Sequence, residues 1–200
     1  MKEDILEQLV DDYLQSRGYF TQHNIKFRPR ENHPDFVTKQ DSNHSDIDII
    51  GVAPRKRGTD RVVAVSCKSW QAGFDVKAKL DEIKHNKIRS GRESWKAFRE
   101  IVQPKWSEAF ISAVREATGT TKFTYITAVT RIKGDRSLWE KNRGFSSALK
   151  GNPIRILTLS DMSTDLLSEL STTLVGSQLG RTLQLLKASG ATIKWQSSKK

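Results

Sequence analysis

The chain has 200 residues, of which 36% are hydrophobic, and this length suits a single domain, residues 1–200, with a core of its own. It carries 34 lysines and arginines against 23 aspartates and glutamates, so its formal net charge at pH 7 is +11. This excess of positive charge favours a polyanion as partner, with nucleic acid ahead of a membrane surface.

Several classes of protein are excluded by what the sequence lacks. The single cysteine, Cys67, rules out an internal disulfide and fits a reducing compartment. No apolar run approaches the ~20 residues that a membrane-spanning helix needs. Glycine-rich nucleotide-binding motifs and the G-x-S-x-G motif of hydrolases are absent from the sequence. We therefore expect a soluble, cytoplasmic protein with no membrane partner, and the sequence leaves a homodimer open.

The first predicted element is a helix over residues 3–17, which Gly18 follows as a C-cap. Its Glu7 lies between apolar pairs and is either a solvated flank residue or a residue at the rim of a site. Residues 19–27 read as the first strand and residues 29–44 as a polar loop. The apolar residues at helical spacing are Ile5, Leu6, Leu9, Val10, Tyr13 and Leu14.

A predicted hairpin follows this loop, and the rest of the chain is organised around it. Residues 46–52 and 61–70 are β-rich runs that flank a turn containing Pro54 and Gly58. Both runs are apolar enough to be largely buried, so charged residues near their ends need a functional reason.

Four polar residues should gather on one face of this hairpin. Asp46 and Asp48 are two residues apart, and so are Ser66 and Lys68, so each pair shares a face of its strand. Cys67 has the opposite parity and is expected to pack on the other face of the sheet. The sequence therefore predicts carboxylates and one ammonium group side by side.

This grouping predicts metal-assisted cleavage of a phosphodiester. Carboxylates can hold Mg²⁺, or Mn²⁺ in its place, because Mg²⁺ takes hard oxygen ligands and keeps several waters. The metal would acidify a water and neutralise charge on the phosphate, while Lys68 orients or deprotonates that water.

The order of these residues resembles the PD-(D/E)xK nuclease superfamily, and the front half is most similar to the Mrr-like branch of restriction-endonuclease-like proteins. The resemblance covers roughly residues 3–90 and rests on Glu7, Asp46, Asp48 and Lys68. It implies an α/β fold with an αβββαβ core, in which a mixed central sheet is flanked by helices. It also implies a magnesium-dependent endonuclease acting on DNA in restriction (defence) or repair, with Asp46, Lys68 and Glu7 in catalysis.

The chain departs from the family pattern at Ser66, where the pattern has Asp or Glu two residues before the lysine. Some restriction enzymes of this superfamily have a Ser-x-Lys motif and supply the carboxylate from the following helix. Glu82 lies fourteen residues after Lys68 in such a predicted helix, and Asp81 is a weaker candidate. The metal ligands that the resemblance implies are therefore Asp46, Asp48 and Glu82.

The hairpin tip is basic and has two interpretations. Arg55, Lys56 and Arg57 stand together in the turn over residues 54–61. They form either a solvated turn or a DNA-binding point that contacts phosphates and positions the protein without reading sequence.

The second half predicts helices and strands that complete the sheet over residues 107–195, and an irregular stretch over residues 133–151. Ser90 is expected to cap a helix over residues 91–102, which Pro104 would end. Asp161 or Ser163 should cap the helix that follows the predicted strand over residues 153–160. The other predicted helices cover residues 75–88, 107–118 and 177–189, and the predicted strands cover residues 122–132, 153–160 and 192–195.

Three functions remain open on the sequence. The first is the metal-dependent endonuclease, and the second is an inactive nuclease-fold protein that only binds nucleic acid, with Ser66 marking a lost metal site. The third is an interaction protein with no affinity for DNA. The five tryptophans are expected to be core or interface anchors rather than platforms for bases. His33 and His44 lack partners at zinc-finger spacing, so we expect them to be loop histidines.

Overall fold

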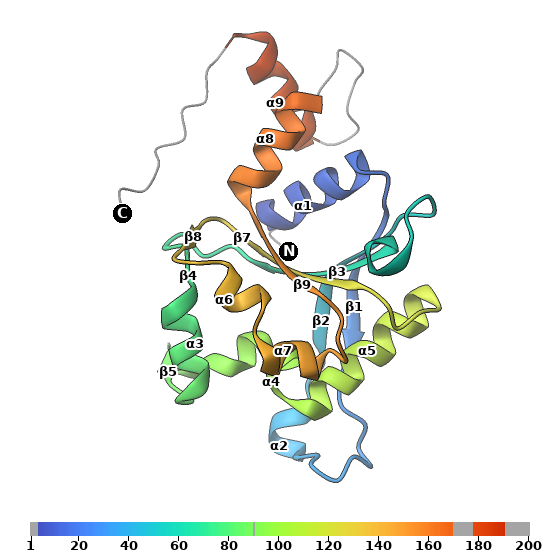
Figure 1. The fold of residues 1–200 in the computed structure, drawn as a ribbon, viewed down its shortest axis with the longest axis vertical. Helices are drawn as coiled ribbons and strands as arrows, with labels where there is room; N and C mark the ends of the chain where they lie inside the picture. Colours follow the sequence, from blue (N-terminus) through green and yellow to red (C-terminus); the bar gives the residue numbers. More distant parts are fainter. Residues whose placement is uncertain (1–3, 90, 170–177, 191–200) are drawn as a thin grey trace.

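We describe residues 4–89, 91–169 and 178–190 in a computed structural model, which is an α/β protein with a mixed five-stranded central sheet (Figure 1). The first three strands form an antiparallel meander, and the last two pair in parallel. The strand order is β1 (Phe20–Phe27), β2 (Ser45–Val52), β3 (Val62–Lys68), β7 (Thr124–Val129) and β9 (Ile154–Thr158). The predicted meander and mixed sheet are confirmed.

Helices cover both faces of the sheet, and each face has its own hydrophobic cluster. One layer consists of α1 (Ile5–Ser16), α8 (Leu159–Glu169) and α9 (Gln178–Ala188) (Figure 1). The other contains α3 (Val76–Lys84), α4 (Arg99–Val102), α5 (Pro104–Thr118), α6 (Ser137–Glu140) and α7 (Arg143–Ala148). We call these the α1 face and the α5 face. No described helix is long and apolar enough to cross a membrane.

The remaining elements are short and lie in the connections. They are α2 (Thr38–Asp41), the 3₁₀ turns η1 (Gly58–Arg61) and η2 (Ser94–Phe98), and two small strand pairs. The first pair is β4 (Phe74–Asp75) with β8 (Ile132–Lys133), and the second is β5 (Ile88–Arg89) with β6 (Arg92–Glu93).

The first helix forms as its sequence predicts. Asp4 caps its N-terminus by accepting a hydrogen bond from the Leu6 amide at 2.9 Å. Gly18 follows the helix with a φ of 79°, the left-handed conformation that glycine adopts without strain. The apolar stripe of the helix is buried against the sheet, through Leu6, Leu9, Val10 and Leu14.

The predicted helix over residues 91–102 is wrong. Gly91 has a φ of 75° and lies in the turn between β5 and β6, so the chain reverses there. The helical turns begin only at Ser94, and Ser90 lies outside the described residues. Pro104 opens α5 instead of only ending the preceding helix, because the first helical position needs no amide donor.

Other expectations about the second half are partly corrected. The stretch expected to be irregular contains α6 and α7, whose Trp139 and Phe145 are buried in the core. Helix α8 begins at Leu159, before both predicted caps. The predicted strand over residues 192–195 lies outside the described residues, and so does Trp195. Trp106 and Trp139 are core residues as expected.

Strand β2 changes the face to which its side chains point, halfway along its length. Ile47 packs in the cluster on the α5 face, whereas Ile49, two residues later, packs in the cluster on the α1 face. The neighbouring β1 has Asn24 at this level, between His23, which pairs with Ile49, and Ile25. Asn24 has a φ of 54°, which interrupts the regular pleat. Asp48 therefore lies at the point where the alternation breaks.

Candidate functional site

Asp48 lies at a fork between β2 and β3. The backbone ladder of these strands runs from the Val52–Val62 pair to the Ile49–Val65 pair. Beyond it, the Asp48 carboxylate accepts a hydrogen bond from the Cys67 amide at 2.6 Å. The Asp48 side-chain oxygen thus takes the place of the backbone carbonyl that would continue the ladder. We call this end of the β2–β3 ladder, with the Asp48 carboxylate in it, the fork.

The predicted gathering of four polar residues on one face is wrong for Asp46. Asp46 precedes Ile47, and alternation along the strand points its side chain away from the α5 face. Its carboxylate pairs across the strands with Lys26, with 2.9 Å between Oδ2 and Nζ. The break in alternation at Asp48 separates the two aspartates.

Ser66 and Lys68 do share a face, as predicted, and it is the α5 face. The Lys68 ammonium lies 5.8 Å from the centre of the Phe98 ring, a residue of the cluster on that face. Among the described residues, the Lys68 ammonium has no hydrogen-bond or ion-pair partner. Ser66 is buried. Lys68 is therefore a cation available beside the fork.

Glu100 is the residue that sequence reasoning missed. It lies on α4, is only 6% exposed, and accepts a hydrogen bond from the Tyr125 hydroxyl. The available signal was an acidic residue inside an apolar stretch, between Phe98 and Ile101. Such a residue is rarely buried without a reason.

The carboxyl groups around the fork interact electrostatically. Burial raises the pKa of Asp48, the Lys68 charge and the Cys67 amide oppose this rise, and Asp46 and Glu100 add to it. Negative charge therefore crowds around Asp48, and Lys68 is the cation that offsets it most.

Glu7 belongs to the same electrostatic group, from the α1 face. Burial raises the pKa of Glu7 first, and the Asp48 and Asp4 charges raise it further, against a lowering by His23. Asp48 is therefore approached by Glu7 from one face of the sheet and by Lys68 and Glu100 from the other.

The predicted ligand set Asp46, Asp48 and Glu82 does not converge. Glu82 is buried, but its carboxylate pairs with Lys79 at 2.7 Å and Arg89 at 2.9 Å. Burial raises its pKa, and hydrogen bonds from these two residues lower it by more. Asp81 is exposed and pairs with Lys87. The described residues include no group of three or more His, Cys, Asp and Glu that could hold a metal ion.

Cys67 packs against the cluster on the α1 face, as its parity predicts. Burial raises the pKa of its thiol, and the charges of Asp48 and Glu7 raise it further. The thiolate, which is the nucleophilic form, is therefore suppressed.

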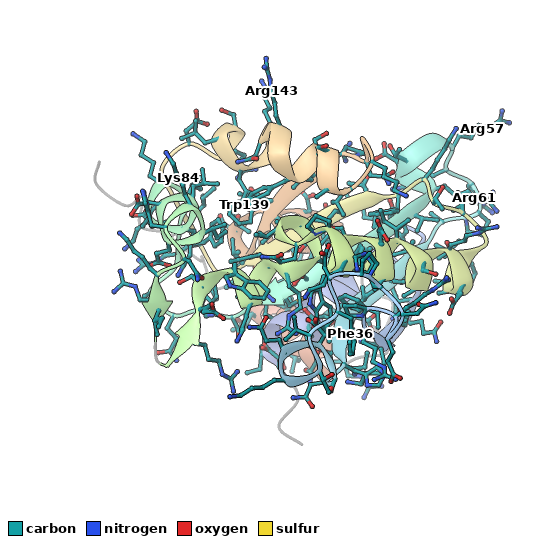
Figure 2. The ribbon with its side chains drawn as sticks, turned by 90° about the horizontal axis from the view of Figure 1, so that it is seen from below. Phe36, Arg57, Arg61, Lys84, Trp139 and Arg143 are labelled. Atoms are coloured by element: carbon teal, nitrogen blue, oxygen red, sulfur yellow. The ribbon has the colours of Figure 1, made fainter. Side chains whose placement is uncertain are left out.

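The basic hairpin tip lies far from helix α3. Figure 2 shows Arg57 and Arg61 projecting at one end of the molecule, while Lys84 of α3 lies at the opposite end. Lys56 is held by Tyr19, with its Nζ 3.2 Å from the hydroxyl and 4.3 Å from the ring centre. Arg55 and Arg57 are exposed, and their predicted phosphate contacts stay a prediction.

Comparison with known proteins finds a distant structural similarity and no match in sequence. No protein-family model matches the chain, and no curated protein matches it. A solved structure, a repair endonuclease from Pyrococcus abyssi, is similar with a TM-score of 0.31 and 11% sequence identity. The match covers 80% of this chain and 48% of that one, so the chain spans about half the length of the endonuclease. This TM-score is too low to argue a shared fold or activity.

Proposed function

We propose that this chain is a metal-dependent DNA endonuclease whose centre is the fork at Asp48, with Lys68 and Glu100 beside it. The observation that carries the proposal is that one unpaired ammonium group, Lys68, and one buried carboxylate, Glu100, act electrostatically on the half-buried Asp48 carboxylate in a basic protein. Glu100 supplies the carboxylate that Ser66 lacks, in the role that the sequence assigned to Glu82.

The donor set suits a divalent ion with few protein ligands. Mg²⁺ is commonly held by one or two carboxylates, and waters and substrate phosphates complete its shell. Asp48 and Glu100 would be these carboxylates, with Asp46 and Glu7 near the opposite face of the fork. A bound Mg²⁺ or Mn²⁺ would acidify a water and neutralise charge on the scissile phosphate. The raised pKa of Asp48 fits this proposal, because a cation would relieve the crowded negative charge.

The roles of the protein side chains follow from their partners. Lys68 has no ion pair among the described residues, so its ammonium is available to orient the attacking water or a phosphate oxygen. The Tyr125 hydroxyl fixes the Glu100 carboxylate, which would otherwise be buried without a partner. Asp48 is fixed in turn by the Cys67 amide.

The test is a cleavage screen over single-stranded, duplex, overhanging and branched DNA in Mg²⁺ and in Mn²⁺. Wild-type protein is expected to cut at least one form, and Lys68→Ala and Asp48→Asn are expected to cut none while their circular dichroism spectra remain native. Exposed Lys150→Ala serves as the matched control for loss of one lysine. Full activity in either site variant would refute the assignment.

A second function is favoured by two observations. Ser66 stands where the nuclease pattern has a carboxylate, and no group of three or more metal-ligating residues occurs in the described ranges. Both fit a protein that binds nucleic acid without cutting it. Calorimetry with Mn²⁺ separates the functions, because the binding-only protein gives no heat of metal binding and no cleavage.

A further inference from the structure

A basic hollow of about 890 Å³ opens on the side of α3 and α4, and Trp70 in its wall packs against Phe98, the ring that the Lys68 ammonium also faces. Its wall includes Trp70, which follows Lys68 by two residues, and Arg99, which precedes Glu100. His44, just before β2, lines it as well. The β5–β6 hairpin and η2 complete the wall, and α3, β5 and α4 can be found in Figure 1. The hollow is thus continuous in sequence with three of the segments that build the fork.

The charge of this hollow is strongly positive. Glu93 is the single carboxylate among its described lining residues. The lining lysines and arginines are Lys39, Lys79, Arg89, Arg92, Lys96 and Arg99. Such an imbalance attracts an anion.

Half of these cations are already compensated. Lys79 and Arg89 pair with Glu82, and Lys96 pairs with Glu93 at 2.9 Å. The uncompensated positive charge of the hollow must therefore come from Lys39, Arg92 and Arg99.

Lys39, Arg92 and Arg99 have no ion pair within the described part of the chain. Arg99 is partly buried, and its Nε donates to the Lys96 carbonyl at 3.1 Å. Its guanidinium lies 4.5 Å from the centre of the Trp106 ring. An anion entering the hollow would relieve this unmatched charge.

The uncharged lining residues narrow the class of anion. Trp70 stacks on Phe74, with ring centres 6.1 Å apart and planes at 14°, and Lys79 lies 4.6 Å from the Trp70 ring centre. Trp95 is also in the wall, with 9% of its surface exposed. The side-chain amides of Gln40, Asn43 and Gln71 add neutral hydrogen-bond donors and acceptors. Cations, indole rings and amides together suit nucleotides better than a simple inorganic anion.

The size of the hollow favours a flexible strand. Pockets of about 300–1,000 Å³ enclose small ligands, so this one can take a few nucleotides but not a rigid duplex. We propose that the hollow binds an unpaired segment of DNA, a single strand or an overhanging end, and leads it to the fork. Delivery of the strand to the fork rests on the proposed nuclease function, whereas binding in the hollow does not.

The experiment measures binding of the full chain by fluorescence anisotropy in EDTA, so that no metal chemistry contributes. The probes are a labelled 12-nucleotide single strand, the blunt duplex of the same sequence, and that duplex with an overhang. The single strand and the overhang are expected to bind at least about tenfold more tightly than the blunt duplex, because stacking on aromatic residues needs unpaired bases. Equal or tighter binding of the blunt duplex would overturn the proposal.

A matched pair of variants tests the location. Lys39→Ala/Arg92→Ala removes two exposed cations of the hollow, and Arg143→Ala/Lys150→Ala removes two exposed cations from the α7 region, where Figure 2 shows Arg143 projecting. The first variant should make the negative slope of log affinity against log salt shallower by about 1.4, at about 0.7 per phosphate contact. The second variant should leave it nearly unchanged. Equal slopes in the two variants would overturn the proposal.

These results are separable from the nuclease assignment. Cleavage of blunt duplex without preferential binding of single strands would refute the inference and leave the nuclease standing. Preferential binding of single strands without cleavage of any DNA would support the inference and refute the nuclease assignment.

Discussion

At the scale of the residue, Asp48 is the group on which the site depends. Its carboxyl is buried among other acids, so its pKa is raised above the ordinary value of 3.8. A carboxyl with a raised pKa favours the folded state when protonated and destabilises it when ionised. Its stabilising contribution is therefore complete below pH 3.8 and is lost as pH rises through the higher, folded-state pKa.

Replacing Asp48 should consequently stabilise the metal-free protein at neutral pH. Asp48→Asn keeps an oxygen that can accept from the Cys67 amide and removes the charge. In EDTA, the midpoint of thermal unfolding should be higher than that of wild type at pH 7.5, and the difference should shrink towards pH 3.8. An unchanged or lower midpoint at pH 7.5 would contradict the described environment of Asp48. Asp81→Asn, at an exposed carboxylate whose pKa is lowered by Lys87, provides a control of opposite sign.

At the scale of the element, the change of face along β2 decides which residues meet. Asn24 of β1 holds a φ of 54° at this level. Asn24→Gly should leave stability nearly unchanged, because glycine adopts this conformation freely. Asn24→Val should lower the free energy of unfolding by about 1–2 kcal/mol, since a β-branched residue is strained there. Urea unfolding of both variants measures the difference, and equal stabilities would show that the conformation at Asn24 is not required.

The same element explains how far the sequence could predict the site. Strict alternation correctly placed Ser66 and Lys68 on one face and Cys67 on the other. It failed for Asp46, because the break in alternation arises from the pairing of two strands, and a pattern within one strand does not reveal it. The break also explains why Asp48, and not Asp46, occupies the fork.

The helices show the same limit. Amphipathic stretches such as α1 and α5 could be predicted because local spacing determines them, although α5 begins at Pro104 and not at residue 107. Residues 91–102 were predicted as one helix, although Gly91 permitted the turn that starts a strand pair there. Glu100 was missed with it, because its burial depends on Tyr125, a residue of a distant strand. Glu82 had suitable spacing, but its neighbours Lys79 and Arg89 neutralise it.

At the scale of the whole molecule, charge should govern association with DNA. The net charge of +11 and the basic hollow both predict affinity that falls steeply as salt releases the protein from phosphates. A gel shift of a labelled strand at about 50 and about 200 mM salt measures this, with a decrease in affinity of at least about tenfold expected for several phosphate contacts. Absence of any shift at low salt would favour an interaction protein with no DNA affinity.

The most direct measurement compares two glutamates in one cleavage assay with Mn²⁺ and labelled DNA. If Glu100 supplies the carboxylate beside Lys68, Glu100→Gln should lower the cleavage rate at least about 100-fold, whereas Glu82→Gln should cut at close to the wild-type rate, once both variants are shown to be folded by circular dichroism. Cleavage by Glu100→Gln at the wild-type rate, or loss of cleavage in folded Glu82→Gln alone, would contradict a centre built from Asp48, Lys68 and Glu100.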